Sequence, residues 1–437
     1  MTQLTDFKQK STPDGDMPTV VTFGCRLNSF ESIVIQEHLT ATQTTDTIVV
    51  NTCAVTSEAE RQARQSIRRL HRKHPHAKII ATGCAAQINP EAYAAIDGVT
   101  RVIGNHEKMQ AETYGIGAHP SIQVTDIMAV KESAGHLITG FDGRARAFIE
   151  IQNGCNHRCT FCTIPFGRGN NRSIPTGEIV NQVQNLVDQG CQEVVLTGVD
   201  ITDYGKDLPG QPTLGQLVRR TLACIPTLPR LRLSSIDPVE VDQALYQVIE
   251  TEPRLMPHFH ISLQSGDDMI LKRMKRRHLR RDILHFCNTV LRVRPDAVFG
   301  ADIIAGFPTE TEDMFCQSLS IVEAAPLTYL HVFSYSPRPD TPAAKMPQVP
   351  HKTIKSRTKR LIEKGDGAKA QWLQRQVGKT LSVLLETQGS SPHLYQGHCP
   401  HYAPITVSSE EKPLVLGKIY DVFIQDATAK YLTGIIQ

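Results

Sequence analysis

The sequence lacks the features that would place a protein in a membrane or outside the cell. No apolar run reaches the roughly 20 residues that cross a bilayer. The N-terminus, MTQLTDFKQKSTPDGDMP, is polar and has no hydrophobic stretch typical of a signal peptide. We therefore expect a cytoplasmic protein without membrane contacts, whose eleven cysteines do not form a disulfide framework. In a reducing compartment, clustered cysteines indicate metal binding and scattered ones indicate core packing.

The sequence also lacks a large net charge and internal repeats. The net charge of +3 is too small to indicate a nucleic-acid partner by itself, so local clusters must carry that argument. The chain contains no tandem repeat and no low-complexity block. Its length of 437 residues favours roughly three domains, and its composition is ordinary for a globular protein.

The first third of the chain is predicted to be a parallel α/β domain. Residues 1–18 are expected to form a loose tail, and residues 19–135 the domain itself. Ser57 and Glu60 have capping-box spacing at the start of a helix expected over 57–74. Alternating strands and helices indicate a parallel sheet, whose ligands lie at the carboxyl ends of the strands. The predicted strands are 19–23, 46–50, 77–81 and 100–103.

Three cysteines of this domain each come just after a predicted strand. Cys25, Cys53 and Cys84 are 28 and 31 residues apart, which matches no local motif. Because parallel strands end at one edge of a sheet, the three can converge there. The alternative is three buried thiols that only pack in the sheet, since buried cysteine is common. Their turn-forming and polar neighbours favour a second metal cluster.

The rest of the chain divides into two further predicted domains. Residues 140–375 show six strands with helices between them, which favours an open β/α barrel with function at the carboxyl ends of its strands. Residues 376–437 alternate short apolar runs with Gly and Pro turns, which is typical of a small all-β barrel. Such a barrel either binds RNA, which we favour, or is a structural cap. The six central strands are expected near 146–152, 193–198, 230–235, 258–264, 298–305 and 329–335.

A CxxxCxxC loop follows the first central strand. Cys155, Cys159 and Cys162 lie on one short segment, and the next cysteine is Cys191. Three thiolates on such a loop can hold three irons of a four-iron cluster and leave the fourth iron open, as in radical S-adenosylmethionine (SAM) enzymes. Zinc is the alternative, but a structural zinc site needs four ligands, and His157 is awkwardly placed inside the loop. The remaining cysteines are predicted to be packing residues: Cys191, Cys224, Cys287, Cys316 and Cys399.

Several segments together resemble the radical SAM methylthiotransferase family. They are TFGCRLNSFES, VVNTCAVTSEAERQARQSIRRLHR, TGCAAQ, GCNHRCTFCTIPFGRGNNRS and LTGVDITDYG. The likeness runs from about residue 19 to the end, and the C-terminal part resembles a TRAM domain. NTCAVTSEAERQ combined with PFGRGNNRS is most similar to family members that act on N6-threonylcarbamoyladenosine at position 37 of tRNA.

The resemblance implies two 4Fe-4S clusters and SAM as cofactors. It implies an auxiliary cluster on Cys25, Cys53 and Cys84, and a SAM-binding cluster on the CxxxCxxC loop; all six positions match. The implied reaction methylthiolates carbon 2 of the adenine, whose unactivated hydrogen requires a radical that the cofactor supplies. The expected partners are tRNA and a small redox protein that donates electrons.

Further residues are candidates for contacts with SAM. For each of them, a role in loop packing or in the structure of the barrel rim is the alternative. Gly306 would permit a close backbone approach. The candidates are Phe161 inside the cysteine loop and, at strand ends, Gly198, Asp200, Ser235, Gln264, Ser265 and Gly306.

Basic residues supply the candidates for RNA recognition. Arg168 and Arg172 are candidates to bind the threonyl carboxylate of the substrate; the alternative is an Arg paired with a loop carboxylate. Residues 57–74 hold six Arg or Lys against two Glu, and residues 271–282 hold seven against one Asp. A charge run is usually a solvated face; we favour RNA contact for the second, denser run.

Two other functions stay open on the sequence alone. The nearer one is methylthiolation of another substrate, namely isopentenyladenosine in tRNA or an aspartate of a ribosomal protein. The other belongs to a different class, a non-catalytic RNA-binding protein whose clusters sense redox state or carry electrons. The six intact ligand positions argue against the second.

Overall fold

The structure, a computed structural model, describes residues 19–44, 46–115, 119–131, 145–409 and 413–436. The predicted tail, residues 1–18, lies outside the described residues. The chain divides into two compact units. Unit 1 comprises Met1–Ile138, Glu150–Ile174 and Ser336–Ala344, and unit 2 comprises Thr139–Ile149, Pro175–Tyr335 and Lys345–Gln437. Each unit therefore joins segments that are far apart in the sequence.

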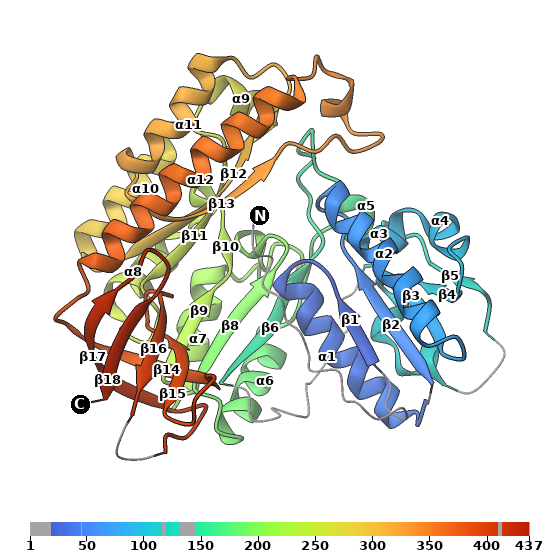
Figure 1. Ribbon diagram of the computed structural model, residues 1–437, viewed down its shortest axis with the longest axis horizontal. Helices are drawn as coiled ribbons and strands as arrows, with labels where there is room; N and C mark the ends of the chain where they lie inside the picture. The colour runs from blue at the N-terminus through green and yellow to red at the C-terminus, as the bar shows by residue number, and fades with distance from the viewer. Residues whose placement is uncertain (1–18, 45, 116–118, 132–144, 410–412, 437) are drawn as a thin grey trace. The chain divides into compact units, whose positions relative to one another are not determined.

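Unit 1 is built on a five-stranded parallel sheet in the order β1-β2-β3-β4-β5 (Figure 1). The strands are β1 (Thr19–Thr22), β2 (Thr47–Thr52), β3 (Lys78–Gly83), β4 (Val99–Ile103) and β5 (Ile122–Gln123). The central strands β2 and β3 are buried almost throughout, as expected for parallel strands with helices on both faces. The predicted parallel α/β sheet is confirmed, while β5 is too short to give a sequence signal.

The helices of unit 1 are short apart from α1 and α2. They are α1 (Arg26–Ala41), α2 (Ser57–Lys73), α3 (Cys84–Ile88), α4 (Pro90–Ala94), α5 (Ile164–Arg168), η1 (Glu107–Met109) and η2 (Ala111–Tyr114). The α2 helix buries a narrow face that includes Ala63 and Ile67. Its N-cap is Thr56, whose hydroxyl accepts from the Ala59 amide at 3.1 Å, so the predicted cap at Ser57 is one residue late.

Two segments from later in the chain complete unit 1. The first contains the CxxxCxxC loop, α5 and β7 (Arg172–Ser173), and α5 packs against α3. The second, Ser336–Ala344, attaches to the start of α2: the Ser57 amide donates to the Ser336 hydroxyl at 3.3 Å, and Arg338 forms an ion pair with Glu60. Both cysteine groups therefore belong to the same compact unit.

Unit 2 contains the remaining strands of an open β/α barrel. Together with β7, they form sheets of order β7-β6-β8-β9 and β10-β11-β12-β13, which confirms the open barrel expected from the sequence. Ser234 interrupts the predicted strand at 230–235. The strands are β6 (Arg146–Asn153), which runs into unit 1, β8 (Glu193–Gly198), β9 (Arg230–Leu233), β10 (Ser235–Ile236), β11 (His258–Gln264), β12 (Val298–Ala305) and β13 (Leu327–Ser334).

Helices separate these strands along the chain. They are α6 (Thr176–Asp188), η3 (Ile201–Asp203), α7 (Leu214–Cys224), η4 (Pro238–Glu240), α8 (Gln243–Thr251), α9 (Asp268–Arg273), α10 (Arg280–Val293), α11 (Glu312–Ala324), η5 (Pro342–Lys345) and α12 (His351–Gln374). Phe259 of β11 and Phe299 of β12 pack against Phe286 of α10, which fixes the outer face of this sheet. Among the described helices, none is both long enough and apolar enough to cross a membrane.

The C-terminal segment is a closed five-stranded barrel in the order β14-β15-β16-β18-β17, as predicted. Its strands are β14 (Thr380–Gln388), β15 (Leu394–His398), β16 (Pro404–Ser408), β17 (Ile419–Ala427) and β18 (Leu432–Ile436). It is attached to the β/α sheet within unit 2. Arg232 donates to the Pro400 carbonyl at 2.9 Å, and Arg230 donates to the Ser382 carbonyl at 2.9 Å.

Candidate functional site

Sheet register brings Cys25, Cys53 and Cys84 to one edge of the unit 1 sheet; we call these three the strand-end triad. Thr22 of β1 pairs with Asn51 of β2, and Thr52 of β2 pairs with Gly83 of β3. Cys53 and Cys84 are the residues that follow Thr52 and Gly83, and Cys25 begins the α1 turn just after β1. The convergence expected from the sequence is therefore present.

The strand-end sulfurs lie in a tightly packed cradle. A Cβ on Gly24, whose φ is +106°, would lie 2.8 Å from the Cys53 sulfur, so only glycine fits there. Burial raises the pKa of the Cys53 thiol to about 12, and the neighbouring Cys25 and Cys84 sulfurs add to the rise. Such a thiol becomes a thiolate only if a metal takes the place of its proton, which is the behaviour expected of a ligand.

Cys155, Cys159 and Cys162 form the second group, the loop triad, which is partly exposed. The Cys155 amide donates to the Gly169 carbonyl at 3.0 Å, and the Cys162 amide donates to the Cys159 carbonyl at 3.1 Å. The Arg158 guanidinium donates to the Cys155 carbonyl at 2.8 Å. Backbone bonds therefore hold the loop in shape.

Both triads fit a four-iron cluster better than a single zinc ion. A tetrahedral zinc with bonds of about 2.3 Å to sulfur would hold its sulfurs within about 3.8 Å of one another. Among the described residues, no three cysteine sulfurs all lie within 4.8 Å of one another. All eleven cysteines are free of disulfides, as expected. A cluster that spreads its ligands over several irons suits this wider spacing.

Helix α5 links the loop triad to the strand-end triad within unit 1. A Cβ on Gly167 would lie 3.1 Å from the Cβ of Cys84, so the two backbones meet closely. The Asn105 amide donates to the Gly167 carbonyl at 2.5 Å and lies 3.8 Å from the Cys84 sulfur. The Thr163 hydroxyl donates to the Ala54 carbonyl at 3.3 Å. The residues that follow the loop triad in the sequence therefore contact Cys84 and a neighbour of Cys53.

Glu31, Lys108 and Arg168 form a fully buried ion network beside these contacts; we call it the charge network. The Lys108 ammonium lies 2.6 Å from one carboxylate oxygen of Glu31, and the Arg168 guanidinium lies 2.8 Å from the other. Burial raises the pKa of Glu31, but the charges of Arg168 and Lys108 outweigh it and hold the pKa below its usual value. The carboxyl is therefore ionised although it has no contact with water.

The charge network also reaches the strand-end sulfurs. The amide oxygen of Asn28 accepts from Arg168 at 2.6 Å and lies 3.8 Å from the Cys25 sulfur. Lys108 donates to the Asn105 oxygen at 2.6 Å, and Asn105 is the neighbour of Cys84. Burial would lower the pKa of Arg168, but Cys84, Glu31 and Cys25 hold it well above its ordinary value.

The structure favours the ion-pair alternative for Arg168, since its guanidinium is spent on Glu31 and Asn28 and is buried. Arg172 is buried as well, and it donates to the Asn170 and Arg168 carbonyls at 3.0 and 2.9 Å. Neither guanidinium is presented at a surface where a substrate carboxylate could reach it. Both guanidinium groups already have partners inside the protein, and a contact of either one with the substrate stays a prediction.

Comparisons with known proteins follow the same division of the chain. Residues 149–321 match the radical SAM superfamily, residues 18–104 match uncharacterized protein family UPF0004, and residues 374–436 match the TRAM domain. The threonylcarbamoyladenosine tRNA methylthiotransferase MtaB of Rickettsia prowazekii is 50% identical over 92% of this chain and 93% of that protein. The MtaB protein of Bacillus subtilis is 32% identical over 94% of each.

The chain belongs to the radical SAM methylthiotransferase family. A tRNA-2-methylthio-N(6)-dimethylallyladenosine synthase of Thermus thermophilus is also similar, at 30% identity over 97% of this chain and 92% of that protein. The solved structure of the radical SAM methyltransferase TsrM from Kitasatospora setae aligns with a TM-score of 0.56 at 14% identity, over 76% of this chain and 74% of that one, and shows the shared fold. This methylthiotransferase is therefore an enzyme that uses a 4Fe-4S cluster and SAM.

The predicted SAM contacts of this radical SAM methylthiotransferase lie at strand ends in unit 2. Gly198 ends β8, Ser235 begins the two-residue strand β10, and Gln264 ends β11 with a left-handed φ of +67°. Asp200 accepts from the Thr202 hydroxyl at 3.1 Å. Phe161 is half-buried in the cysteine loop of unit 1. These placements keep each residue a candidate.

For Ser265 and Gly306, the structure supplies the alternative role in the barrel rim. The Ser265 hydroxyl is fully buried and lies 3.3 Å from that of Ser318 on α11. A Cβ on Gly306 would lie 2.5 Å from Ile354, so its missing side chain makes room for α12. The close approach predicted for Gly306 therefore exists, but its partner is a helix.

The cations of the two basic stretches of the methylthiotransferase have different surroundings in the structure. In 271–282, Arg276 donates to Asp237 at 2.7 Å and to the Ser262 carbonyl at 3.0 Å, and Arg280 donates to the Gln317 carbonyl at 2.7 Å. Arg273 and Arg277 also bind neighbouring loops, to Thr309 and Glu240 respectively. These guanidinium groups hold the barrel rim together and are therefore less available to RNA than the composition of the stretch indicates; RNA contact by this stretch stays a prediction.

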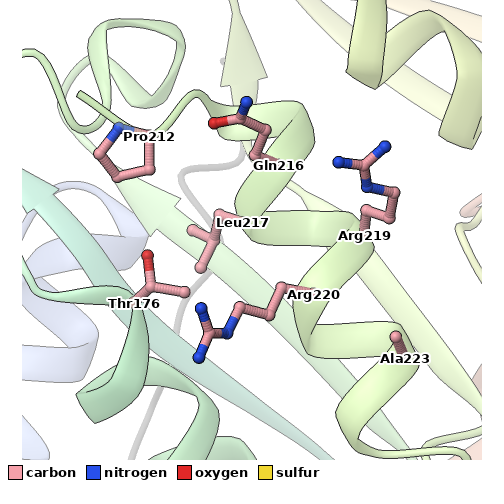
Figure 2. A pocket seen from close by; sticks show the side chains of 7 residues that line it. All are labelled: Thr176, Pro212, Gln216, Leu217, Arg219, Arg220 and Ala223. Atoms are coloured by element: carbon pink, nitrogen blue, oxygen red, sulfur yellow. The ribbon is translucent and has the colours of Figure 1, made fainter. Parts of the chain in front are cut away.

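The α2 stretch has the more available cations. Among the described residues, no hydrogen bond or ion pair holds the exposed side chains of Arg68, Arg69 and Arg72. They border an open hollow of about 480 Å³ whose lining also includes Phe23, two residues before Cys25. A second hollow, of about 470 Å³, lies on α7 and is lined by Thr176, Pro212, Gln216, Leu217, Arg219, Arg220 and Ala223 (Figure 2). It contains none of the predicted site residues.

Of the residues that surround the strand-end triad, Asn28 was among the polar neighbours recognised in the sequence, whereas Glu31, Asn105 and Lys108 were missed. Asn28 and Glu31 share a helix face three residues apart, among the buried apolar residues of α1. Polar residues on a buried face were the available signal. Among the cysteines outside the triads, Cys191, Cys287 and Cys399 are buried as predicted, whereas Cys224 and Cys316 are exposed, so a packing role was wrong for those two.

Proposed function

We propose that this enzyme methylthiolates carbon 2 of N6-threonylcarbamoyladenosine at position 37 of tRNA. The observation that carries the proposal is the pair of separate cysteine triads in one compact unit, which a radical initiator alone would not need. The substrate is supported by the greater identity to MtaB proteins than to the dimethylallyladenosine synthase, 50% against 30%. The expected division is a tail at 1–18, an auxiliary-cluster domain at 19–135, a radical SAM domain at 140–375 and an RNA-binding domain at 376–437.

Each triad has a distinct role in this proposal. The loop triad ligates the cluster that binds SAM, and the strand-end triad ligates an auxiliary cluster. The chemistry that these groups supply when bound is radical generation from SAM at one cluster and sulfur delivery at the other. Gly24 and Gly83 let the strand ends approach each other, and the backbone bonds of the cysteine loop fix its ligands. The chain thereby holds both ligand sets in place before the substrate arrives.

The chain also supplies surfaces for its partners. Arg68, Arg69 and Arg72 on α2 are suited to bind phosphates of the tRNA, because no protein carboxylate neutralises them in the described structure. The closed C-terminal barrel is a fold that commonly holds nucleic acid. A small redox protein is the expected electron donor. Gly198, Asp200, Ser235 and Gln264 are the proposed contacts for SAM at the strand ends, and Phe161 in the cysteine loop.

The test is mass spectrometry of tRNA nucleosides after reaction of reconstituted protein with dithionite, SAM and threonylcarbamoylated tRNA. We expect the 2-methylthio product from the wild-type enzyme. Cys53→Ala should lose this product but still release 5′-deoxyadenosine, whereas Cys159→Ala should lose both. Cys316→Ala, an exposed cysteine on α11, is the matched control and should behave as wild type.

Two results would count against the proposal. A methylthio product from Cys53→Ala would show that the strand-end triad is not needed for sulfur transfer. Faster methylthiolation of dimethylallyladenosine tRNA than of threonylcarbamoyladenosine tRNA would overturn the substrate and leave the family reaction intact. The absence of any 5′-deoxyadenosine from the wild-type protein would favour a non-catalytic RNA-binding role instead.

A further inference from the structure

The buried charges beside the strand-end triad do not balance. Lys108 and Arg168 contribute two positive charges, and the carboxylate of Glu31 between them contributes one negative charge. Lys108 is fully buried, and Glu31 and Arg168 are no more than 2% exposed. Burying an ion without a partner costs several kcal/mol. Burial raises the pKa of Glu150, a further carboxyl near the network, to about 7, so this group supplies only part of a second negative charge at neutral pH. The positive charge that remains indicates a further negative partner beside the network.

The contacts of the network indicate where that negative partner lies. The side-chain oxygen of Asn28 accepts a hydrogen bond from Arg168, and the same oxygen lies 3.8 Å from the Cys25 sulfur. The side-chain oxygen of Asn105 accepts a hydrogen bond from Lys108, and its NH₂ group lies 3.8 Å from the Cys84 sulfur. The Asn105 NH₂ group can therefore donate to the Cys84 sulfur, whereas the Asn28 oxygen accepts from the Cys25 thiol and places Arg168 one residue away from that sulfur. The two amides are fixed by further bonds, from Asn28 to the Thr52 carbonyl at 3.0 Å and from Asn105 to the Gly167 carbonyl at 2.5 Å.

We propose that Lys108, Arg168 and Glu31 are positioning residues that set the charge, and hence the reduction potential, of the auxiliary cluster held by the strand-end triad. This inference rests on the proposed function, because it requires that cluster. Three thiolates make such a cluster anionic, and a further sulfur ligand at its open iron adds negative charge. The net positive charge of the network offsets this and stabilises the more negative state. The potential of an iron–sulfur cluster responds to net charge and to hydrogen bonds near its sulfurs.

The network serves the strand-end triad in particular. The charge network approaches Cys25 through Asn28 and approaches Cys84 through Asn105. Near the loop triad lie backbone hydrogen bonds and the exposed Arg158. The different surroundings of the two triads match their different proposed tasks.

The test uses the full chain with Cys155, Cys159 and Cys162 changed to Ala, so that only the auxiliary cluster can form. Its midpoint potential is measured by a redox titration followed by electron paramagnetic resonance. Adding Lys108→Met should shift the potential to more negative values, because a positive charge is lost. Adding Glu31→Gln should shift it to more positive values, because a negative charge is lost.

The opposite signs separate an electrostatic role from a structural one. General loosening of the site admits water in both variants and moves both potentials in the same direction, which would overturn the proposal. The matched control is Arg101→Met, a half-buried cation of the same unit that binds Thr113 and Gln123, and it should leave the potential unchanged. Equal potentials in Lys108→Met and its parent, at equal iron content, would also overturn the inference.

Two provisions keep the test decisive. If Lys108→Met fails to fold, Asn105→Asp places a negative charge of nearly the same shape beside Cys84 and should also lower the potential. An unchanged potential in Asn105→Asp would refute the role of the network. If the parent protein without the loop cysteines binds no iron at all, the auxiliary cluster of the proposed function fails, and that result is distinct from a failure of the charge network.

Discussion

The two cysteine triads of this enzyme reach similar ligand sets by opposite routes. The loop triad spans eight residues of one segment, from Cys155 to Cys162, and its shape depends on nearby backbone bonds. The strand-end triad draws its cysteines from three strand ends, and its shape depends on sheet register and on buried charges. A local motif can be read from spacing, whereas a site assembled by a sheet depends on the whole domain.

This difference has consequences for what each triad tolerates. A substitution that disrupts the unit 1 sheet should displace all three strand-end cysteines together, because all three lie at one edge of that sheet. Damage to the cysteine loop should leave that sheet intact. Matched substitutions on the two sides test this separation.

The largest effects are expected for Gly83 and Gly154, which precede Cys84 of the strand-end triad and Cys155 of the loop triad. Gly83 has φ +94°, and a Cβ there would lie 2.3 Å from the Thr52 carbonyl oxygen; Gly154 has φ +72°, and a Cβ there would lie 1.8 Å from the Asn170 carbonyl oxygen. Each change to Ala combines left-handed strain with a backbone clash and should destabilise by about 4 kcal/mol or more. Iron analysis should show that Gly83→Ala loses the strand-end iron and Gly154→Ala loses the loop iron.

The control for this pair is Gly190→Ala in unit 2, where φ is also positive but no atom lies within 4 Å of the new Cβ. It should be milder, at about 1–2 kcal/mol from strain alone, and should keep the iron of both triads. Loss of the same iron in Gly83→Ala and Gly154→Ala would break the separation between the two sites.

Glu31 tests the buried charges of the strand-end side. Glu31→Gln leaves Lys108 and Arg168 facing each other without a carboxylate, and breaking a buried pair in this way destabilises by about 3–5 kcal/mol. Urea unfolding of the apoprotein measures the loss. Glu58→Gln is the control, because Glu58 is exposed and its partners are the exposed side chains of Arg61 and Gln62; its effect should be under about 1 kcal/mol. Equal effects would mean that the network is not electrostatically important.

Glu150 provides the corresponding test on the strand that leads to the loop triad. Burial raises its pKa to about 7, and the charge of Glu31 adds to the rise while Arg168 opposes it. In the unfolded chain a Glu titrates near about 4.3. Between these pH values the folded state keeps a proton that the unfolded state has lost, so apoprotein stability should fall as pH rises from about 4.3 to about 7.

The slope from this single group is at most about 1.4 kcal/mol per pH unit. Glu150→Gln removes it, so the stability advantage of the variant over wild type should grow as pH rises through this window. Glu91→Gln, an exposed carboxyl of the same unit, should show no such trend. Urea midpoints between pH 5 and 8 provide the measurement, and a constant difference between Glu150→Gln and wild type would contradict the prediction.

The smallest effects concern the cations of α2, which begins four residues after Cys53. Arg68→Gln and Arg72→Gln should each reduce the salt dependence of tRNA affinity by about one unit of the log–log slope if each neutralises a phosphate. Lys359→Gln, an exposed cation on α12, is the control. Fluorescence titrations at several salt concentrations give the slopes, and unchanged slopes would place the RNA elsewhere.

The sequence predicted the positions of the elements well, because their signals are local. The apolar runs at 46–50, 77–81 and 298–305 are long enough to be recognised as buried strands, and the structure confirms a strand at each place. The two-residue strands β5 and β7 have no such signal. The α2 cap was misplaced by one residue because Thr56 and Ser57 are both good caps, and only the backbone conformation selects Thr56.

The surroundings of the site were harder to predict because they depend on partners far away in the chain. Arg168 follows a cysteine motif and was assigned to the substrate, but its partner Glu31 lies 137 residues earlier. The basic run at 271–282 has the composition of a nucleic-acid surface, yet Arg276 and Arg280 hold loops of the barrel rim. Composition gives the number of charges in a segment and says nothing about which of them are already paired.

The loop triad can be recognised from the sequence alone, because ligands three or four residues apart are held together by the chain. The strand pattern can be recognised as well, because burial on both faces of a parallel sheet requires continuous apolar runs. The meeting of Cys25, Cys53 and Cys84 at one edge becomes visible only in the folded unit, as does the burial of Lys108, Glu31 and Arg168 beside them. Register and buried ion pairing depend on energies summed between distant segments, and these are fixed only when the whole unit folds.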